Sequence, residues 1–318
     1  MSAPQRPILV HKGRQRCTPR RWRRFESLAT GLALALTIVL GPGPGLEFGS
    51  VPAHANVFGL DDRRPLSPDD GISAAGTIVC EGTTRRPSAA LVTLPGMDPE
   101  RRFDLVITVA HTFRGRHDAY YENCQFEAYD ARIAPAPIVR VLLGTETPHR
   151  QWSHDWAVAV LDRRISSKLT PLIPRVVRES ELDALKAAGA HFALVGHEGE
   201  RGPLSISSDC GPRLKQRSDF RPFDRDTFHH DCDMGPGWSG GPLVMLLDGE
   251  AYVIAVNATS VNGIVSVEGD AYDGSFNPNT AVRLDGRFFA ALRRLALPMH
   301  AAASPASGVS AYSAGARP

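Results

Sequence analysis

The sequence predicts an all-β protein. Its 318 residues include 29 glycines and 25 prolines, residue types that interrupt regular structure and favour turns. No heptad repeat or long helical period runs along the chain, and short stretches of β-favouring residues recur between the turns. Many short strands joined by such turns are typical of β-sandwiches and β-barrels. A hydrophobic content of 42% suffices for a buried core and excludes a wholly disordered chain.

The amino end has the pattern of a secretory signal. An arginine-rich cluster, 20–24, precedes a 13-residue apolar run, 28–40, and Ala-His-Ala at 53–55 provides the small residues typical of a cleavage site. A membrane anchor is the alternative, but the run is shorter than the roughly 20 residues that a spanning helix needs. We therefore expect residues 1–55 to be a signal peptide, and the mature protein to be periplasmic or extracellular with no stable membrane span.

The charge of the chain is unevenly distributed. Residues 1–55 contain 8 Lys and Arg against 2 acidic residues, whereas residues 56–318 contain 28 against 32. A nucleic-acid-binding protein needs a basic surface to displace counterions from phosphates. The mildly acidic body therefore predicts no nucleic-acid partner.

The cysteine count agrees with export. Removing the leader removes Cys17 and leaves Cys80, Cys124, Cys210 and Cys232. In an oxidising compartment these four are expected to form two disulfides, although reduced core cysteines are an alternative and three pairings are possible. No Cys-x-x-Cys spacing is present, and neighbouring residues of the His229–Asp233 run would point in opposite directions in an extended segment. We therefore expect no metal site and no cofactor.

Turn residues divide the rest of the chain into short elements. Residues 56–71 are polar and are expected to be a linker or propeptide, and 298–318 are expected to be a flexible tail. Two helices are expected, over 179–188 and 286–295. The remaining body, of about 240 residues, is too large for one small barrel and suits two Greek-key barrels. Strands are expected near 75–80, 89–94, 104–109, 138–143, 156–161, 191–196, 203–208, 242–247, 251–257 and 279–283.

Three local sequences place chemically useful residues beside apolar runs: T-V-A-H ending at His111, D-W-A-V beginning at Asp155, and G-W-S-G-G-P around Ser239. A rigid strand end can hold an imidazole beside a cleft. Small neighbours of a serine let the backbone turn tightly and let its N–H groups converge on an oxyanion. Each motif alone also has an ordinary structural explanation. Together they occur in the order His, Asp, Ser, which is that of the chymotrypsin-type triad and not of subtilisins or α/β-hydrolases.

With these motifs the sequence resembles the trypsin-like (chymotrypsin-fold) serine peptidases, especially the secreted bacterial branch that includes glutamyl endopeptidases. The resemblance covers about 72–297 and includes the run D-C-D-M-G-P-G-W-S-G-G-P ending at Pro242. It implies two six-stranded Greek-key β-barrels, about 72–165 and 170–285, with the active site between them and a short C-terminal helix.

The resemblance also implies roles for single residues. Ser239 would be the nucleophile, His111 the general base, and Asp155 the group that orients the imidazole. The backbone N–H groups of Gly237 and Ser239 would form the oxyanion hole. The implied activity is that of a monomeric serine endopeptidase acting on peptides or proteins. An inactive pseudoprotease that serves as a binding module, or an esterase with the same triad, remains an alternative.

Specificity, activation and disulfide pairing follow less directly from the resemblance. Asp233 lies six residues before Ser239, where trypsins place the acid that binds Arg or Lys, although this acid also occurs in the bacterial relatives without that role. Asn257 stands where glutamyl endopeptidases generally use a histidine, which makes a preference for Glu doubtful. Trp238 replaces the aspartate that trypsins use in activation. The disulfides implied are Cys80–Cys124 and Cys210–Cys232.

Overall fold

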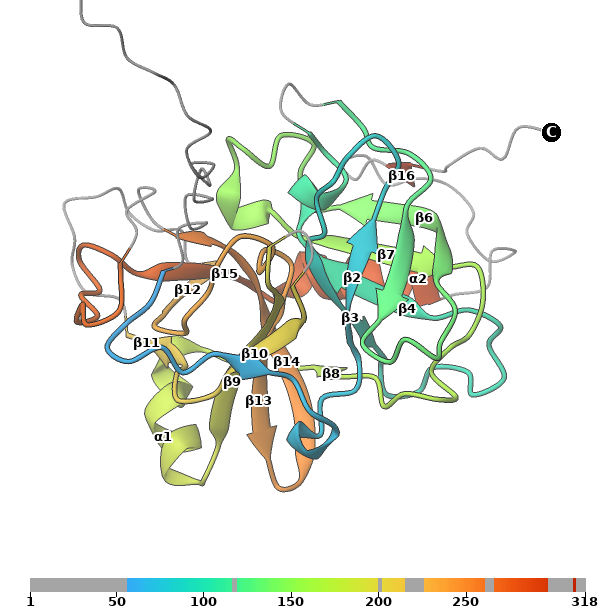
Figure 1. Ribbon diagram of the computed structural model, residues 1–318. Coiled ribbons are helices and arrows are strands. Elements are labelled where there is room, and N and C mark those ends of the chain that lie inside the picture. The colour runs from blue at the N-terminus through green and yellow to red at the C-terminus, as the bar shows by residue number, and fades with distance from the viewer. Residues whose placement is uncertain are drawn as a thin grey trace, which may run out of the picture. The chain divides into compact units, whose positions relative to one another are not determined.

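The computed structural model describes residues 56–115, 119–199, 202–214, 226–260 and 266–296, and the backbone of 311–312. The expected signal peptide, 1–55, and most of the expected tail, 298–318, lie outside the described residues. Within them, strands dominate and form two sheets (Figure 1). The predicted all-β class is therefore confirmed.

The first sheet is a closed barrel of six strands. Its strands follow the order β6-β5-β2-β3-β4-β7, and pairing of β6 with β7 closes the ring. Strands β3, β4 and β7 are buried along their whole length, which explains why they read as uninterrupted apolar runs in the sequence. The six strands are β2 (Ala75–Val79), β3 (Ser88–Val92), β4 (Leu105–Thr108), β5 (Gln125–Ala128), β6 (Ala136–Leu143) and β7 (Ala157–Leu161).

The second sheet contains nine strands among the described residues, in the order β1-β10-β9-β13-β14-β15-β12-β11, with β8 pairing beside β14. No ladder of backbone hydrogen bonds among these residues closes it into a ring. Instead, the disulfide Cys210–Cys232 joins the segments that follow β10 and β12. The strands are β1 (Arg64–Pro65), β8 (Ile173–Pro174), β9 (His191–His197), β10 (Leu204–Ser207), β11 (Pro212–Arg213), β12 (Thr227–His230), β13 (Pro242–Leu247), β14 (Glu250–Ser260) and β15 (Asn279–Arg283).

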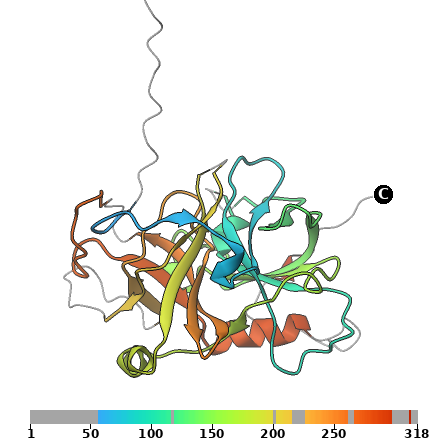
Figure 2. The same ribbon diagram turned by 60° about the horizontal axis from the view of Figure 1, so that its bottom comes forward.

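Both expected helices are present, although the first begins with a tighter turn. Residues Glu179–Glu181 form a 3-10 turn before α1 (Leu182–Ala187). The second helix, α2 (Gly286–Ala296), buries Phe288, Leu292 and Leu295 and packs against β7 of the first barrel. Figure 2 shows α2, in red, along the lower side of the ribbon. The apolar stripe on α2 therefore forms core, as its spacing predicts. Among the described residues, no helix is both long and apolar enough to cross a membrane.

Residues 56–71, expected to be a linker or propeptide, pack along the second sheet. Val57 and Leu66 are buried, and β1 pairs with β10. Asn56 exchanges two backbone hydrogen bonds with Met234, which lies in the loop before Ser239. The amino-terminal segment of the described chain is thus a structural part of the second sheet, next to the candidate site. At the other end, β16 (Ala311–Tyr312), within the segment expected to be a flexible tail, pairs with β6.

Candidate active site

His111 and Asp155 are brought together by the pairing of two strands. Thr108, at the end of β4, pairs with Ala157, at the start of β7, so residues just outside these strands become neighbours. Asp155 is buried and its Oδ2 lies 2.6 Å from Nδ1 of His111. Its Oδ1 accepts the backbone N–H of His111 at 2.9 Å. The carboxylate therefore holds both the ring and the main chain of His111.

This arrangement selects one form of the neutral imidazole. An ionised carboxylate can only accept hydrogen bonds, so Nδ1 of His111 must carry the proton that faces Asp155. The lone pair is then on Nε2, which is the atom available to act as a base. This hydrogen bond is the contact through which Asp155 would orient the imidazole of a catalytic base.

Ser239 lies in the loop before β13 and lines the same cavities as His111. One cavity has a volume of about 500 Å³ and the other about 260 Å³, and both are lined by His111 and Ser239. The Ser239 hydroxyl donates a hydrogen bond to the Ala258 carbonyl at 2.9 Å, and within the described part of the chain none joins it to His111. Attack would require rotation about the Cα–Cβ bond of Ser239, which turns the hydroxyl towards Nε2.

The loop before Ser239 leaves two N–H groups available. No described residue accepts a hydrogen bond from the backbone N–H of Gly237 or of Ser239. The carbonyl of Pro236, by contrast, accepts the N–H of Gly199 at 2.7 Å. Because C=O and N–H point in opposite directions in a trans peptide, this bond turns the Gly237 N–H away from Gly199. Two free N–H groups beside a serine are what an oxyanion hole requires.

Ser88, in β3 of the first barrel, fixes this loop from the other side. Its backbone N–H donates to the Ser239 carbonyl at 2.8 Å, and its hydroxyl donates to the Gly237 carbonyl at 2.7 Å. The same hydroxyl accepts the backbone N–H of His197 at 2.8 Å. Ser88 is fully buried, so these bonds do not compete with water. The sequence contains no signal for this role, because Ser88 stands at the start of an apolar strand like any strand-end serine.

Trp238 anchors the loop that carries Ser239, residues 234–241, in the core of the second barrel. This loop is called the nucleophile loop below. Its side chain is fully buried and lies against Gly196 of β9, where an added Cβ would stand 2.3 Å from the indole. Only glycine therefore fits at position 196. In this chain an apolar contact at Trp238 holds the position where trypsins have an aspartate.

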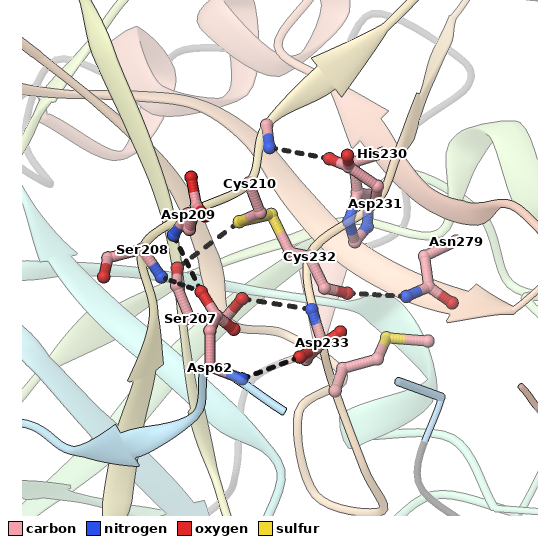
Figure 3. The surroundings of a disulfide bond; sticks show 12 residues. Asp62, Ser207, Ser208, Asp209, Cys210, His230, Asp231, Cys232, Asp233 and Asn279 are labelled. Carbon is pink, nitrogen blue, oxygen red and sulfur yellow. Dashed lines mark hydrogen bonds between the residues drawn. A yellow bond between two sulfur atoms is a disulfide. The ribbon is translucent and has the colours of Figure 1, made fainter. Parts of the chain in front are cut away.

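The carboxylate of Asp233 faces the amino-terminal segment and not the cavities beside Ser239. Figure 3 shows its hydrogen bond with Asp62. Its Oδ1 accepts the N–H of Phe58 at 2.7 Å and its Oδ2 accepts the N–H of Asp62 at 3.0 Å. Asp233 is 2% exposed, and neither cavity beside Ser239 is lined by it. Burial raises the pKa of Asp233 to about 6, although the two N–H groups act in the opposite direction. Its carboxylate thus holds the amino-terminal segment.

Asn257 also supports the loop from within the protein. Its Nδ2 donates to the Trp238 carbonyl at 2.9 Å, and its Oδ1 lies 3.1 Å from Nε2 of His230. Burial lowers the pKa of His230 to about 4, so its ring is neutral and donates Nε2–H to Asn257. The backbone carbonyl of Asn257 accepts the N–H of Gly240 at 2.7 Å. Asn257 is fully buried and lines neither cavity.

Both implied disulfides, Cys80–Cys124 and Cys210–Cys232, are present. Cys80–Cys124 joins the end of β2 to the start of β5, and Cys80 lines the larger cavity. Cys210–Cys232 holds the segment that leads through Asp233 to the nucleophile loop (Figure 3). Disulfides form and persist in oxidising compartments.

Comparison with solved structures identifies the fold. A Glu endopeptidase solved in complex with MPD is similar over 76% of this chain and 99% of its own, with a TM-score of 0.53 and 14% identity. The protease Anisep from Arthrobacter nicotinovorans covers 70% of this chain and 93% of its own, at a TM-score of 0.48 and 16% identity. No protein-family model and no curated protein matches the chain. The similarity to the Glu endopeptidase shows that the chain has the trypsin-like two-barrel fold of serine proteases.

Proposed function

We propose that this chain is an exported serine endopeptidase that hydrolyses peptide bonds through an acyl-enzyme on Ser239. The observation that carries the proposal is the contact of His111 Nδ1 with Asp155 Oδ2 at 2.6 Å, at the edge of a cavity that Ser239 also lines. A base, its orienting acid and a hydroxyl in one cavity are the parts that nucleophilic hydrolysis needs.

In the first half of the reaction, Ser239 Oγ attacks the carbonyl carbon of the scissile bond and His111 Nε2 takes the hydroxyl proton. The negative charge that develops on the carbonyl oxygen is stabilised by the N–H groups of Gly237 and Ser239. His111 then gives its proton to the departing amine as the C–N bond breaks. Asp155 stabilises the imidazolium that exists between these two proton transfers.

In the second half, water attacks the acyl carbon and His111 Nε2 accepts its proton. The bond between the acyl carbon and Ser239 Oγ breaks, and the proton returns to Oγ, which restores the starting enzyme. The two disulfides and the predicted signal peptide support a mature protein that works outside the reducing cytosol.

The proposal is tested by covalent labelling. The full chain is expressed with export into an oxidising periplasm, purified and treated with a fluorophosphonate, and its intact mass is measured. We expect one label per chain, and none in Ser239→Ala. Ser208→Ala, which removes an exposed serine hydroxyl, is the matched control and should label like the wild type. A folded wild-type protein that takes no label would contradict the proposal and favour a pseudoprotease.

Turnover separates a peptidase from an esterase that uses the same triad. Unlabelled protein from a preparation that reacts with the fluorophosphonate is incubated with a peptide library and with a set of simple esters. Cleavage is followed by mass spectrometry. We expect peptide bonds to be cleaved, and Asp155→Asn to lower kcat by about 10⁴-fold because the imidazole loses its orienting carboxylate. Ester hydrolysis without any peptide cleavage would support the esterase alternative.

A further inference from the structure

The two cavities beside Ser239 share Arg85, His111 and Ser239 and differ in the rest of their lining. The smaller one is lined by Ala258 and Thr259 of β14. The larger one is lined by Cys80 and Pro236, and by Thr83, Arg85, Arg86 and Pro87. Ser239 and His111 line both, so a peptide that crosses the site occupies both cavities. Beyond Val256, β14 pairs only with β15 among the described residues, so its other edge, beside the smaller cavity, can take an extended segment of the substrate. We therefore assign the acyl part to this edge and the leaving part to the larger cavity.

The larger cavity is cationic. Its described lining contains Arg85 and Arg86 and no acidic residue. Arg86 is paired with Glu127 of β5, so its charge is already partly compensated. Arg85 is the other arginine of this cavity, and no acidic side chain among the described residues forms an ion pair with it.

A hydrogen bond to Thr83 fixes the backbone of Arg85. Its guanidinium has no hydrogen-bond or ion-pair partner in the described part of the chain. Its backbone N–H donates to Oγ1 of Thr83 at 3.1 Å. No hydrogen bond or ion pair joins its guanidinium to any described residue. Arg85 also lines the smaller cavity, which places it beside the point where the two cavities meet at His111 and Ser239.

We propose that Arg85 binds a carboxylate of the substrate on the leaving-group side of the scissile bond. A planar guanidinium matches a carboxylate with two parallel hydrogen bonds. The carboxylate is either the side chain of Asp or Glu shortly after the bond, or the terminal carboxylate of a short leaving peptide. This inference depends on the proposed function, because it needs an acyl-enzyme and a leaving group.

Acyl transfer tests this subsite separately from the acyl side. An ester substrate forms the acyl-enzyme, and added dipeptides compete with water for it. When a dipeptide attacks, its amine forms a bond to the acyl carbon, the bond to Ser239 Oγ breaks, and the amine proton reaches Oγ through His111. The ratio of transfer product to hydrolysis product then reports how well the dipeptide binds on the leaving-group side.

Four dipeptides distinguish the two sources of the carboxylate: Ala-Glu-amide, Ala-Gln-amide, Ala-Ala-amide and Ala-Ala with a free carboxyl end. We expect Ala-Glu-amide to exceed Ala-Gln-amide about 5- to 20-fold if the side chain is bound, and free Ala-Ala to exceed its amide by a similar factor if the terminus is bound. Either preference should weaken as salt rises, because Arg85 is exposed and its charge is screened.

Variants link the preference to Arg85. Arg85→Gln should reduce it to less than twofold, Arg85→Lys should keep part of it, and Arg85→Glu should favour Ala-Lys-amide. The matched control is Arg132→Gln, which removes an exposed arginine that pairs with Asp130. Equal transfer to acidic and neutral dipeptides, or a preference that survives Arg85→Gln, would overturn the inference alone. Failure of the ester to acylate Ser239 would instead overturn the proposed function and the inference with it.

Discussion

Asp62 donates its backbone N–H to the carboxylate of Asp233 at 3.0 Å, although 171 positions separate the two residues in the chain. Phe58 donates a second N–H to the same carboxylate, and the Asp62 side chain accepts the N–H groups of Ser208 and Asp209. These bonds connect the amino-terminal segment to the loop that carries Ser239. Segment and loop are therefore expected to fold and unfold together.

The first prediction is that Asp233 contributes to stability and not to substrate choice. Asp233→Asn should keep the P1 preference of the wild type, because both oxygens of Asp233 face the amino-terminal segment. It should lower the free energy of unfolding by about 1–3 kcal/mol, because the NH2 group of the introduced amide cannot accept a hydrogen bond and one of the two backbone N–H groups loses its acceptor. A peptide library and urea unfolding measure the two effects. Asp209→Asn is the exposed control, and loss of a preference for Arg or Lys in Asp233→Asn would place Asp233 in the specificity pocket after all.

The second prediction concerns pH. Burial raises the pKa of Asp233 from 3.8 to about 6, so between these values the folded state holds a proton that the unfolded state has lost. Stability from this group is therefore fully present below about pH 4 and is lost as the pH rises to about 6. The difference in unfolding free energy between wild type and Asp233→Asn should fall across this window and stay constant above it. A difference that grows with pH would contradict the raised pKa.

The third prediction is that Ser88 positions the nucleophile loop. Ser88→Ala removes the hydroxyl that bridges His197 and Gly237 and leaves the His197 N–H buried without its acceptor. A cost of about 1–3 kcal/mol is expected for such a group, and an equal loss in the transition state would lower kcat about 5- to 150-fold. KM should change little, because Ser88 touches neither cavity.

Ser205→Ala controls for the loss of any buried hydroxyl. Ser205 is buried in β10, and no hydrogen bond among the described residues joins it to the nucleophile loop. Steady-state kinetics and urea unfolding of both variants separate positioning from stability. If Ser205→Ala lowers kcat as much as Ser88→Ala, the effect of Ser88 is one of general stability.

The parts of the fold that the sequence predicts are those with strong local patterns. All ten expected strands are present, because each is an apolar run bounded by turn residues. The strands that pattern did not predict are short, such as β8 and β11, or polar, such as β5 and β12. In β12 the buried pair His229 and His230 reads as polar although both are core residues.

The candidate site divides in the same way. His111, Asp155 and Ser239 stand in motifs whose order is informative, and all three line the smaller cavity. Asp233 shows the limit of reasoning from an offset, because position along the chain does not say which way a carboxylate points. Its partners lie in 56–71, whose sequence carries no periodic signal. The donors to Asp233 are backbone N–H groups, which every residue except proline has. Such hydrogen bonds therefore cannot be predicted from the residue types of the two segments.

The last prediction concerns Gly237, whose φ of +96° is left-handed and whose Cβ, if present, would lie 2.5 Å from the His197 carbonyl. Gly237→Ala must therefore shift the loop. The backbone N–H of residue 237, which the hydrogen bond from Gly199 to the Pro236 carbonyl orients, would then move out of the oxyanion hole. Losing one such donor costs about 100- to 1,000-fold in kcat. Gly249→Ala is the matched control, since Gly249 has a φ of +79° but no atom within 4 Å of an added Cβ. It should lose a little stability and keep full kcat. A folded Gly237→Ala protein with wild-type kcat would exclude its N–H from the oxyanion hole, whereas a loss shared with Gly249→Ala would point to backbone strain alone.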